Sequence, residues 1–214
     1  MDHAPPFPAD FRLILASQSP RRHSLLRDIG VPFTVVSSRA EEVSTGRDAP
    51  RLAEMNAAAK VKGACLPGGL PPGAFVVGTD TLVTVDGMVM GKPGSADGAA
   101  AMLAALSGRT HQVVSAVALL RRMDSGARGR PDEVRVASAV TDVTFVPLER
   151  AQIDAYVSSG EWKGKAGGYA IQGLAGLFVS EVRGEYSNVV GLPLCLLARL
   201  FRESGFDLIR REWS

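Results

Sequence analysis

Apolar residues gather in short runs separated by polar and glycine-rich segments, a pattern that predicts an α/β fold. Residues 11–16, with the sequence FRLILA, predict a buried strand, and residues 20–29 predict a helix that ends at Gly30. Residues 32–38 predict a second strand, and the alanine-rich residues from about 50 to 65 predict a second helix. The chain therefore opens with alternating strands and helices.

The strongest strand pattern lies further along, in AFVVGTDT at residues 74–81. The alternating residues after it predict a hairpin that turns at Asp86 and Gly87. Ser95 and Asp97 then predict the N-terminal cap of a helix with the sequence ADGAAAMLAAL. This part of the chain adds a buried strand, a hairpin and a helix to the fold.

Two long β-branched runs follow, THQVVSAVALLRR and EVRVASAVTDVTFV, and the loop DSGARGRP joins them. The C-terminal part predicts a helix at 148–159, a glycine-rich loop at 160–176, a strand at 177–190 and an amphipathic helix at 192–205. The length of the two runs favours a sheet that crosses the molecule. The expected fold is therefore α/β, with helices flanking a mixed, strongly curved central sheet.

Length and cysteine content narrow the class of protein. A chain of 214 residues is long enough to bury about 70% of its unfolded surface without a disulfide framework. Cys65 and Cys195 belong to no CxxC or Cys/His motif, so we expect reduced thiols in a cytoplasmic protein. The first ten residues have no basic start and no apolar core, and no apolar stretch is long enough to span a membrane. Neither secretion nor membrane insertion is expected.

The charge balance argues against nucleic acid and membrane surfaces as partners. The chain has 24 basic and 22 acidic side chains, which gives a formal net charge of only +2. A nucleic-acid interface built from Arg21, Arg22 and the DSGARGRP loop remains an alternative, but this basic cluster is short. We therefore expect anions to be recognised locally.

The segment SQSPRR places two arginines at the start of a predicted helix. Ser19 and Pro20 suit the N-cap and the first helical position, which puts Arg21 and Arg22 in the first turn. The helix dipole disfavours positive charge there unless an anion binds, and helix N-termini bind phosphate. The alternative is that both arginines are solvated near a carboxylate such as Asp28.

Two acidic residues are candidates for catalysis or metal binding. Asp80 follows the apolar run VVG, where we expect the strand to end, and ligands of α/β sheets gather at the carboxyl ends of strands. The alternative role for Asp80 is to cap a turn. Glu42 lies in a polar segment, where its neighbour Glu41 serves equally well and where carboxylates are usually solvated.

The late loop KGKAGGYAIQG is a further candidate site. Its glycines let the backbone approach a ligand, while Lys165, Tyr169 and Gln172 supply donors and an aromatic face. A flexible connection is the more common role of such a loop. Lys92, between Gly91 and a proline, is either a directed cation or a solvated surface residue.

Several common catalytic motifs are missing from the sequence. It contains no GxxxxGK[ST], GxGxxG, GxSxG or HExxH motif. The three histidines do not cluster, and His111 lies within a long strand pattern, where a satisfied sheet residue is the expected role. Histidine chemistry is therefore not expected.

Six motifs, taken in order, resemble those of the Maf family of nucleoside triphosphate pyrophosphatases. They are ASQSPRR, VVGTDT, GKP, SGRTHQVVSAVAL, KAGGYAIQG and NVVGLPL, and the resemblance covers residues 11–203. It implies a cytoplasmic, metal-dependent enzyme that converts a nucleoside triphosphate to the monophosphate and pyrophosphate. It also implies a single domain at 11–214, after a lead at 1–10, with two lobes around a nucleotide cleft and often a homodimer.

The resemblance also implies roles for individual residues. Asp80 matches the catalytic acid, and Asp80 with Glu42 would hold Mg²⁺ or Mn²⁺ through oxygen ligands. The residues that match substrate-binding positions are Ser17, Arg21, Arg22, Lys60, Thr81, Lys92, Lys165 and Gln172. Among these, Arg21, Thr81 and Gln172 match the branch that acts on dTTP and UTP. The family pattern is not followed at Asn56, whose role stays open.

Three alternatives to a dTTP and UTP pyrophosphatase are distinguishable. One is an enzyme that also accepts modified or purine triphosphates. Another is a nucleotide-binding regulator of septum formation without turnover, against which Asp80 and the two lysines argue. The third, the nucleic-acid binder, is disfavoured by the near-neutral charge.

Overall fold

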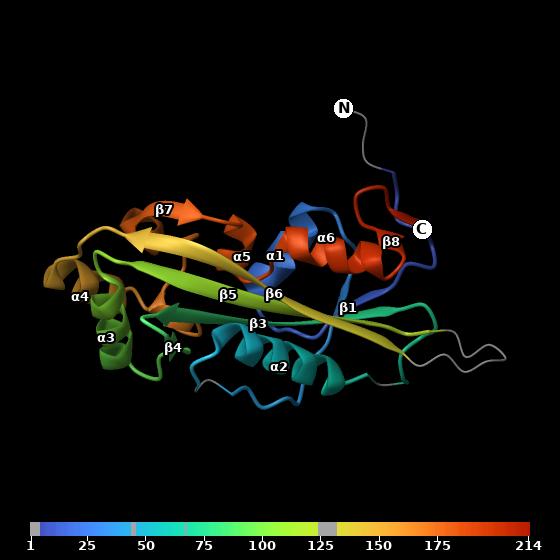
Figure 1. The fold of residues 1–214 in the computed structure, drawn as a ribbon, viewed down its shortest axis with the longest axis horizontal. Helices are drawn as coiled ribbons and strands as arrows, with labels where there is room; N and C mark the ends of the chain where they lie inside the picture. Colours follow the sequence, from blue (N-terminus) through green and yellow to red (C-terminus); the bar gives the residue numbers. More distant parts are fainter. Residues whose placement is uncertain (1–4, 44–45, 67, 124–131) are drawn as a thin grey trace.

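A mixed seven-stranded sheet runs the length of the molecule (Figure 1). The computed structural model describes residues 5–43, 46–66, 68–123 and 132–214. The strand order is β2-β1-β3-β5-β6-β7, with β4 paired to β3; β1 is parallel to β2 and β3, and all other pairs are antiparallel. The strands are β1 Leu13–Leu15, β2 Thr34–Val35, β3 Phe75–Val85, β4 Met88–Met90, β5 Thr110–Arg121, β6 Glu133–Phe145 and β7 Val179–Arg183. The predicted mixed central sheet is confirmed.

Helices cover the sheet at both ends. Helix α2 lies along one face of β3, β5 and β6, while α1, α5 and α6 lie on the opposite face (Figure 1). Helices α3 and α4 pack together at the far end of the long strands. The α-helices are α1 Pro20–Asp28, α2 Ala49–Lys62, α3 Ala96–Leu106, α4 Arg150–Ser158, α5 Tyr186–Val190 and α6 Leu194–Glu203. None of the helices in the described part of the chain has the length and apolarity to cross a membrane.

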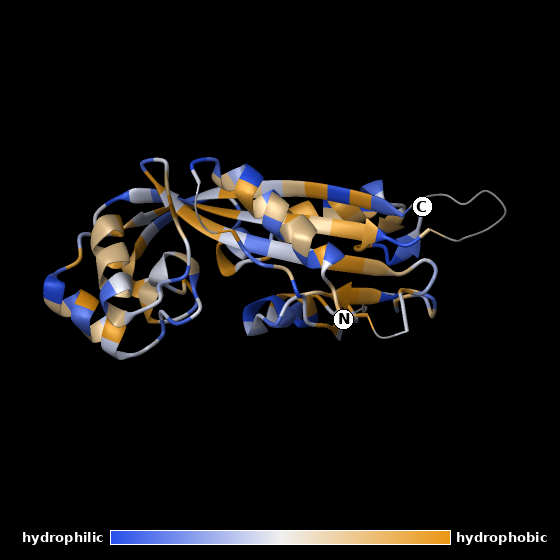
Figure 2. Cartoon of the chain, turned by 90° about the horizontal axis from the view of Figure 1, so that it is seen from below, coloured by the Kyte–Doolittle hydropathy of each residue, from blue (hydrophilic) through white to orange (hydrophobic). Residues whose placement is uncertain are grey.

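Three apolar clusters make up the core, one beneath each group of helices. One lies between the sheet and α1 with α6, one between the sheet and α2, and one around α3 and α4. The strands that cross the molecule are largely hydrophobic, whereas the connecting turns are largely hydrophilic (Figure 2). The two helix-covered ends of the sheet therefore have separate cores, joined by the long strands.

The chain ends pack together beside the first cluster. Phe7 stacks on Phe206, with ring centroids 6.1 Å apart, and contacts Phe11 at 4.8 Å. A short hairpin of β8 Phe206–Asp207 and β9 Glu212–Trp213 closes this end of the molecule. Two short 3₁₀ helices, η1 Ala166–Gly168 and η2 Leu174–Phe178, lie within the segment predicted as a glycine-rich loop.

Two predicted strands differ from the structure. The strand predicted at 32–38 is reduced to Thr34–Val35, with only a single bridge further on at Ser38. The strand predicted at 177–190 ends at Arg183, because Gly184 turns the chain with a φ of 130° and α5 follows. A short apolar run such as VV does not distinguish a buried strand from a buried helix. The predicted loop DSGARGRP, residues 124–131, lies outside the described residues.

Candidate active site

Strand β3 changes its neighbour near Asp80, and this leaves an open stretch along one of its edges. β1 pairs with β3 only as far as Val77, and β4 pairs with it only from Val83 onward. Asp80 itself pairs with Ala116 of β5 on the other edge. The prediction that the strand ends at about Asp80 is therefore wrong, since β3 continues to Val85. The sheet is nevertheless interrupted on one side, because neither β1 nor β4 pairs with the intervening residues on that edge of β3.

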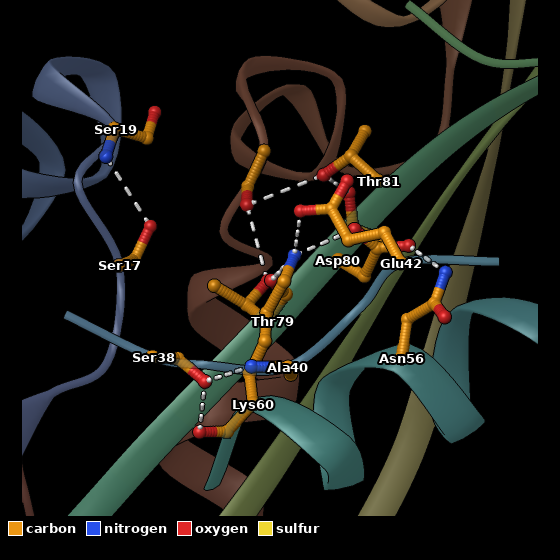
Figure 3. A network of polar contacts seen from close by, with 12 residues as sticks. Ser17, Ser19, Ser38, Ala40, Glu42, Asn56, Lys60, Thr79, Asp80 and Thr81 are labelled. Atoms are coloured by element: carbon orange, nitrogen blue, oxygen red, sulfur yellow. Dashed lines mark hydrogen bonds and ion pairs between the residues drawn. The ribbon is translucent and has the colours of Figure 1, made fainter. Parts of the chain in front are cut away.

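Helix α2 contacts both carboxylate oxygens of Asp80 (Figure 3). Lys60 Nζ lies 2.7 Å from Asp80 Oδ1 and donates to the backbone oxygen of Thr79 at 3.0 Å. Asn56 Nδ2 donates to Asp80 Oδ2 at 2.7 Å. All three polar side chains, those of Asn56, Lys60 and Asp80, are buried. A carboxylate removed from water in this way needs its charge-assisted partners.

Glu42 lies next to Asp80 and Lys60 and forms ion pairs with two lysines. Its Oε1 is 2.8 Å from Lys60 Nζ, and its Oε2 is 2.7 Å from Lys92 Nζ. Burial works to raise the pKa of Glu42, but the hydrogen bonds and charges of the two lysines outweigh it and lower this pKa to about 2. Glu42 is therefore ionised. Acidic and basic side chains alternate along this part of the site, in the order Asp80, Lys60, Glu42 and Lys92.

The glycine of VVGTDT allows α2 to lie this close to β3. A β-carbon at Gly78 would lie 2.5 Å from the backbone oxygen of Ala57 and 2.8 Å from Val61 Cγ2. Only a residue without a side chain fits there. The same approach brings Asn56 and Lys60 within hydrogen-bond distance of Asp80.

The two arginines at the start of α1 have different surroundings. Arg22 donates to the backbone oxygen of Gly191 at 2.8 Å, to Ser17 Oγ at 3.0 Å and to Thr81 Oγ1 at 3.2 Å. Burial lowers the pKa of Arg22 to about 10, with Asp80 acting in the opposite direction. Among the described residues, Arg21 makes one long bond, from Nε to the oxygen of Val190 at 3.4 Å, and burial lowers its pKa as well. Within this part of the chain, most of its guanidinium donors are therefore free for a ligand.

The late glycine-rich segment forms another wall of the cleft. Gly167 and Gly168 have φ values of 67° and 73°, and a β-carbon at Gly167 would lie 2.9 Å from Val83 Cγ2. Tyr169 is buried, and its hydroxyl lies 2.8 Å from Nε2 of His111. His111 lies in β5 as expected, but the expectation of a satisfied side chain is only partly confirmed, because its Nδ1 is buried without a hydrogen-bond partner among the described residues. Gln172 has no side-chain hydrogen bond among the described residues.

Glu161 fixes the end of this segment. It accepts from Tyr156 Oη at 3.0 Å through Oε1 and from the backbone nitrogen of Leu174 at 3.0 Å through Oε2. A β-carbon at Gly173 would lie 2.2 Å from Oε2 of Glu161, so the two residues are in direct contact.

Burial lowers the pKa of Lys165, which lies in the same segment, and the nearby charge of Arg21 lowers it further.

One cleft of about 570 Å³ brings the predicted site residues together. This volume lies in the usual range for small-molecule sites. The predicted residues that line it are Ser17, Arg21, Arg22, Glu42, Lys60, Asp80, Thr81, Lys92, Lys165 and Gln172. Two residues that were not predicted, Lys163 and Ser38, also line the cleft. The two lysines of the KGK sequence could have indicated Lys163.

The chemistry of the donor set fits a hard divalent cation. Glu42 and Asp80 both contact one ammonium nitrogen, that of Lys60, so both carboxylates reach a common position. No group of three His, Cys, Asp or Glu side chains suited to a metal occurs among residues 5–43, 46–66, 68–123 and 132–214. Mg²⁺ commonly takes one or two carboxylates and completes its shell with water and substrate phosphates. These residues fit that mode of binding.

Known proteins are similar to this chain over most of its length. A family model described as Maf-like protein matches residues 12–204. The dTTP/UTP pyrophosphatase of Symbiobacterium thermophilum is 43% identical, over 92% of this chain and 96% of its own. The dTTP/UTP pyrophosphatase of Moorella thermoacetica is 46% identical, over 92% of this chain and 97% of its own. A crystal structure of a nucleoside-triphosphatase / dITP/XTP pyrophosphatase from Mycobacterium abscessus aligns at 21% identity with a TM-score of 0.40, over 64% of this chain and 75% of that chain.

Proposed function

The chain belongs to the Maf-like protein family, and from this premise we propose that it hydrolyses dTTP and UTP to the nucleoside monophosphate and pyrophosphate. One observation supports the proposal most directly. A buried carboxylate, Asp80, lies in the same cleft as Arg21, Lys60, Lys92 and other cations. A triphosphate needs several positive charges, and attack of water on phosphorus needs an acceptor for a proton.

Asp80 is the proposed acceptor. Its two carboxylate oxygens take one hydrogen bond each from Lys60 and Asn56, and each oxygen has a further lone pair for a water molecule. The water oxygen forms a bond to the α-phosphorus while the bond from that phosphorus to the bridging oxygen breaks. The proton of the water passes to Asp80, and pyrophosphate leaves with the bridging oxygen.

The cations of the cleft bind the triphosphate and stabilise the charge that develops on pyrophosphate. Arg21 has guanidinium donors without a partner in the described parts of the chain, and the side chains of Lys92 and Lys165 line the same cleft. Ser17 Oγ accepts from Arg22 and from the backbone of Ser19, which leaves its own proton for a phosphate oxygen. Arg22 holds the walls of the cleft together through three internal bonds.

A divalent metal ion is part of the proposal. Glu42 and Asp80 are the residues that would hold Mg²⁺ or Mn²⁺. The ion would neutralise phosphate charge and polarise the reacting phosphoryl group. Lys60 lies between the two carboxylates, so it would share these oxygens with the metal or turn toward the substrate.

Base selection is assigned to Gln172 and Thr81. Gln172 has an amide without an internal partner among the described residues, and an amide both donates to and accepts from the edge of a base. Thr81 Oγ1 lies 2.9 Å from Ser115 Oγ and accepts from Arg22, so its position is set from inside the fold. Residence in the cytoplasm and a homodimer stay predictions.

A panel of nucleotides tests the proposal. The purified protein is incubated with Mg²⁺ or Mn²⁺ and dTTP, UTP, CTP, GTP, ITP or 7-methyl-GTP, and monophosphate, pyrophosphate and orthophosphate are separated. Monophosphate and pyrophosphate, mainly from dTTP and UTP, are the expected products. Equal activity on all six substrates would indicate the broad enzyme. Binding without products would indicate the regulator without turnover.

A further inference from the structure

Asn56 makes three hydrogen bonds in the buried layer between α2 and β3. Its Oδ1 accepts from the backbone nitrogen of Val43 at 2.9 Å. Its Nδ2 donates to the backbone oxygen of Val43 at 2.8 Å and to Asp80 Oδ2 at 2.7 Å. Both amide hydrogens and the amide oxygen are thus in use. No residue types other than Asn and Gln combine an uncharged double donor with an acceptor in this way.

These contacts link two parts of the site that are distant in sequence. Val43 directly follows Glu42, so fixing the backbone of Val43 fixes the position from which the Glu42 side chain extends. The same amide holds Oδ2 of Asp80. Lys60, one helical turn later on α2, holds Oδ1 of Asp80 and Oε1 of Glu42. Both carboxylates are therefore fixed from the same helix.

We propose that Asn56 is a positioning residue of the active site, which holds the Asp80 carboxylate and the segment carrying Glu42 in the arrangement that hydrolysis requires. Asn56 does not line the cleft, so it acts through these two acids and not on the substrate. A misplacement of about 1 Å in a catalytic group costs as much as 10²-fold in rate. Only the expected effect on kcat rests on the proposed function; the expected positions of the two acids do not.

Two variants test the role of Asn56. Asn56→Leu keeps the approximate volume and removes all three hydrogen bonds, and Asn56→Ser is too short to reach Val43 and Asp80 together. For both variants we expect kcat for dTTP, per folded molecule, to fall about 10- to 100-fold while KM changes less than about threefold. Glu54→Gln is the matched control, because Glu54 also lies on α2 but accepts from Ser138 Oγ and does not line the cleft.

A crystal structure of Asn56→Leu or Asn56→Ser without nucleotide supplies a readout that does not depend on activity. We expect the Asp80 carboxylate to be rotated and residues 42–43 to be displaced relative to the wild-type protein. The proposal is overturned if both acids keep their positions, or if kcat of both variants stays within about twofold of wild type. If wild-type protein hydrolyses none of the nucleotides, the proposed function fails, and the two crystal structures alone decide whether Asn56 positions the acids.

Discussion

Gly78 lies so close to Ala57 that a side chain has no room, because its β-carbon would be 2.5 Å from the backbone oxygen of Ala57. This contact joins β3 to α2 two residues before Asp80. It therefore determines how near Asn56 and Lys60 come to the Asp80 carboxylate. The geometry of the site thus depends on the close packing of α2 against β3.

Gly78→Ala is expected to lower both stability and activity. The added methyl group must push α2 away from β3, which costs about 1–3 kcal/mol of the free energy of unfolding. The displacement also lengthens the bonds from Lys60 and Asn56 to Asp80, so kcat falls. Denaturant unfolding and dTTP hydrolysis measure the two effects. Gly94→Ala is the control, since a β-carbon there meets no atom within 4 Å. Wild-type kcat in Gly78→Ala would show that this close approach does not matter for catalysis.

The two adjacent arginines are expected to give different phenotypes when replaced by alanine. Arg21→Ala removes free donors from the cleft, and a charge-assisted bond of about 1.5–3 kcal/mol corresponds to a rise in KM for dTTP of roughly 10- to 100-fold. Its thermal stability should change little. Arg22→Ala removes three internal hydrogen bonds, those to the oxygen of Gly191 and to the hydroxyl groups of Ser17 and Thr81, so its melting temperature should fall clearly. Steady-state kinetics and thermal unfolding of both variants test this. A large loss of stability in Arg21→Ala alone would contradict it.

The regular elements of this fold follow from local patterns. The long β-branched runs became β5 and β6, Ser95 caps α3 by accepting from the nitrogen of Gly98, and the chain turns at Asp86 and Gly87 with positive φ values. These features depend on residues close in sequence, and propensity and turn chemistry describe them well. The cleft residues were found mainly through the family motifs.

Features that depend on distant residues were not predictable in the same way. The role of Asn56 depends on Val43 and Asp80, which its own position on a helix does not reveal. Asp80 is in the middle of a strand because β5 continues beside it, and that pairing joins residues more than 30 positions apart. Likewise, residues 186–190 form a helix whose Asn188 bonds to the backbone of β5. Tertiary contacts outweigh local pattern in each case.

Asp80→Asn is expected to separate binding from turnover. The substitution keeps the size of the side chain but removes the charge and the ability to accept a proton from water. We expect kcat for dTTP to fall about 10²- to 10⁴-fold, the usual contribution of general base catalysis. Nucleotide affinity, measured by calorimetry with a dTTP analogue that cannot be cleaved between its α- and β-phosphates, should stay within about tenfold of wild type. Equal losses of affinity and turnover would argue against a chiefly catalytic role for Asp80.

His111 is expected to make the protein less stable as the pH falls from 6.5 to 4. Burial lowers the pKa of His111 from its ordinary value of 6.5 to about 4, so the folded protein holds a neutral imidazole where the unfolded chain takes up a proton. The stability from this group is complete above pH 6.5 and is lost as the pH approaches 4, by about 3 kcal/mol at most. The depressed pKa of Glu42, about 2 against 4.5, acts in a lower pH range.

Denaturant unfolding at several pH values between 7 and 4.5, with wild type and His111→Phe, isolates this contribution. Phenylalanine fills the aromatic site beside Phe145 and Tyr169 but carries no titrating group, so its stability should decline less over this range. All other ionisable groups are present in both proteins, so their contributions cancel in the comparison. The same pH dependence in both proteins would mean that His111 takes up its proton equally well in the folded and unfolded states. A steeper decline in wild type would show that burial keeps the His111 imidazole neutral in the folded protein.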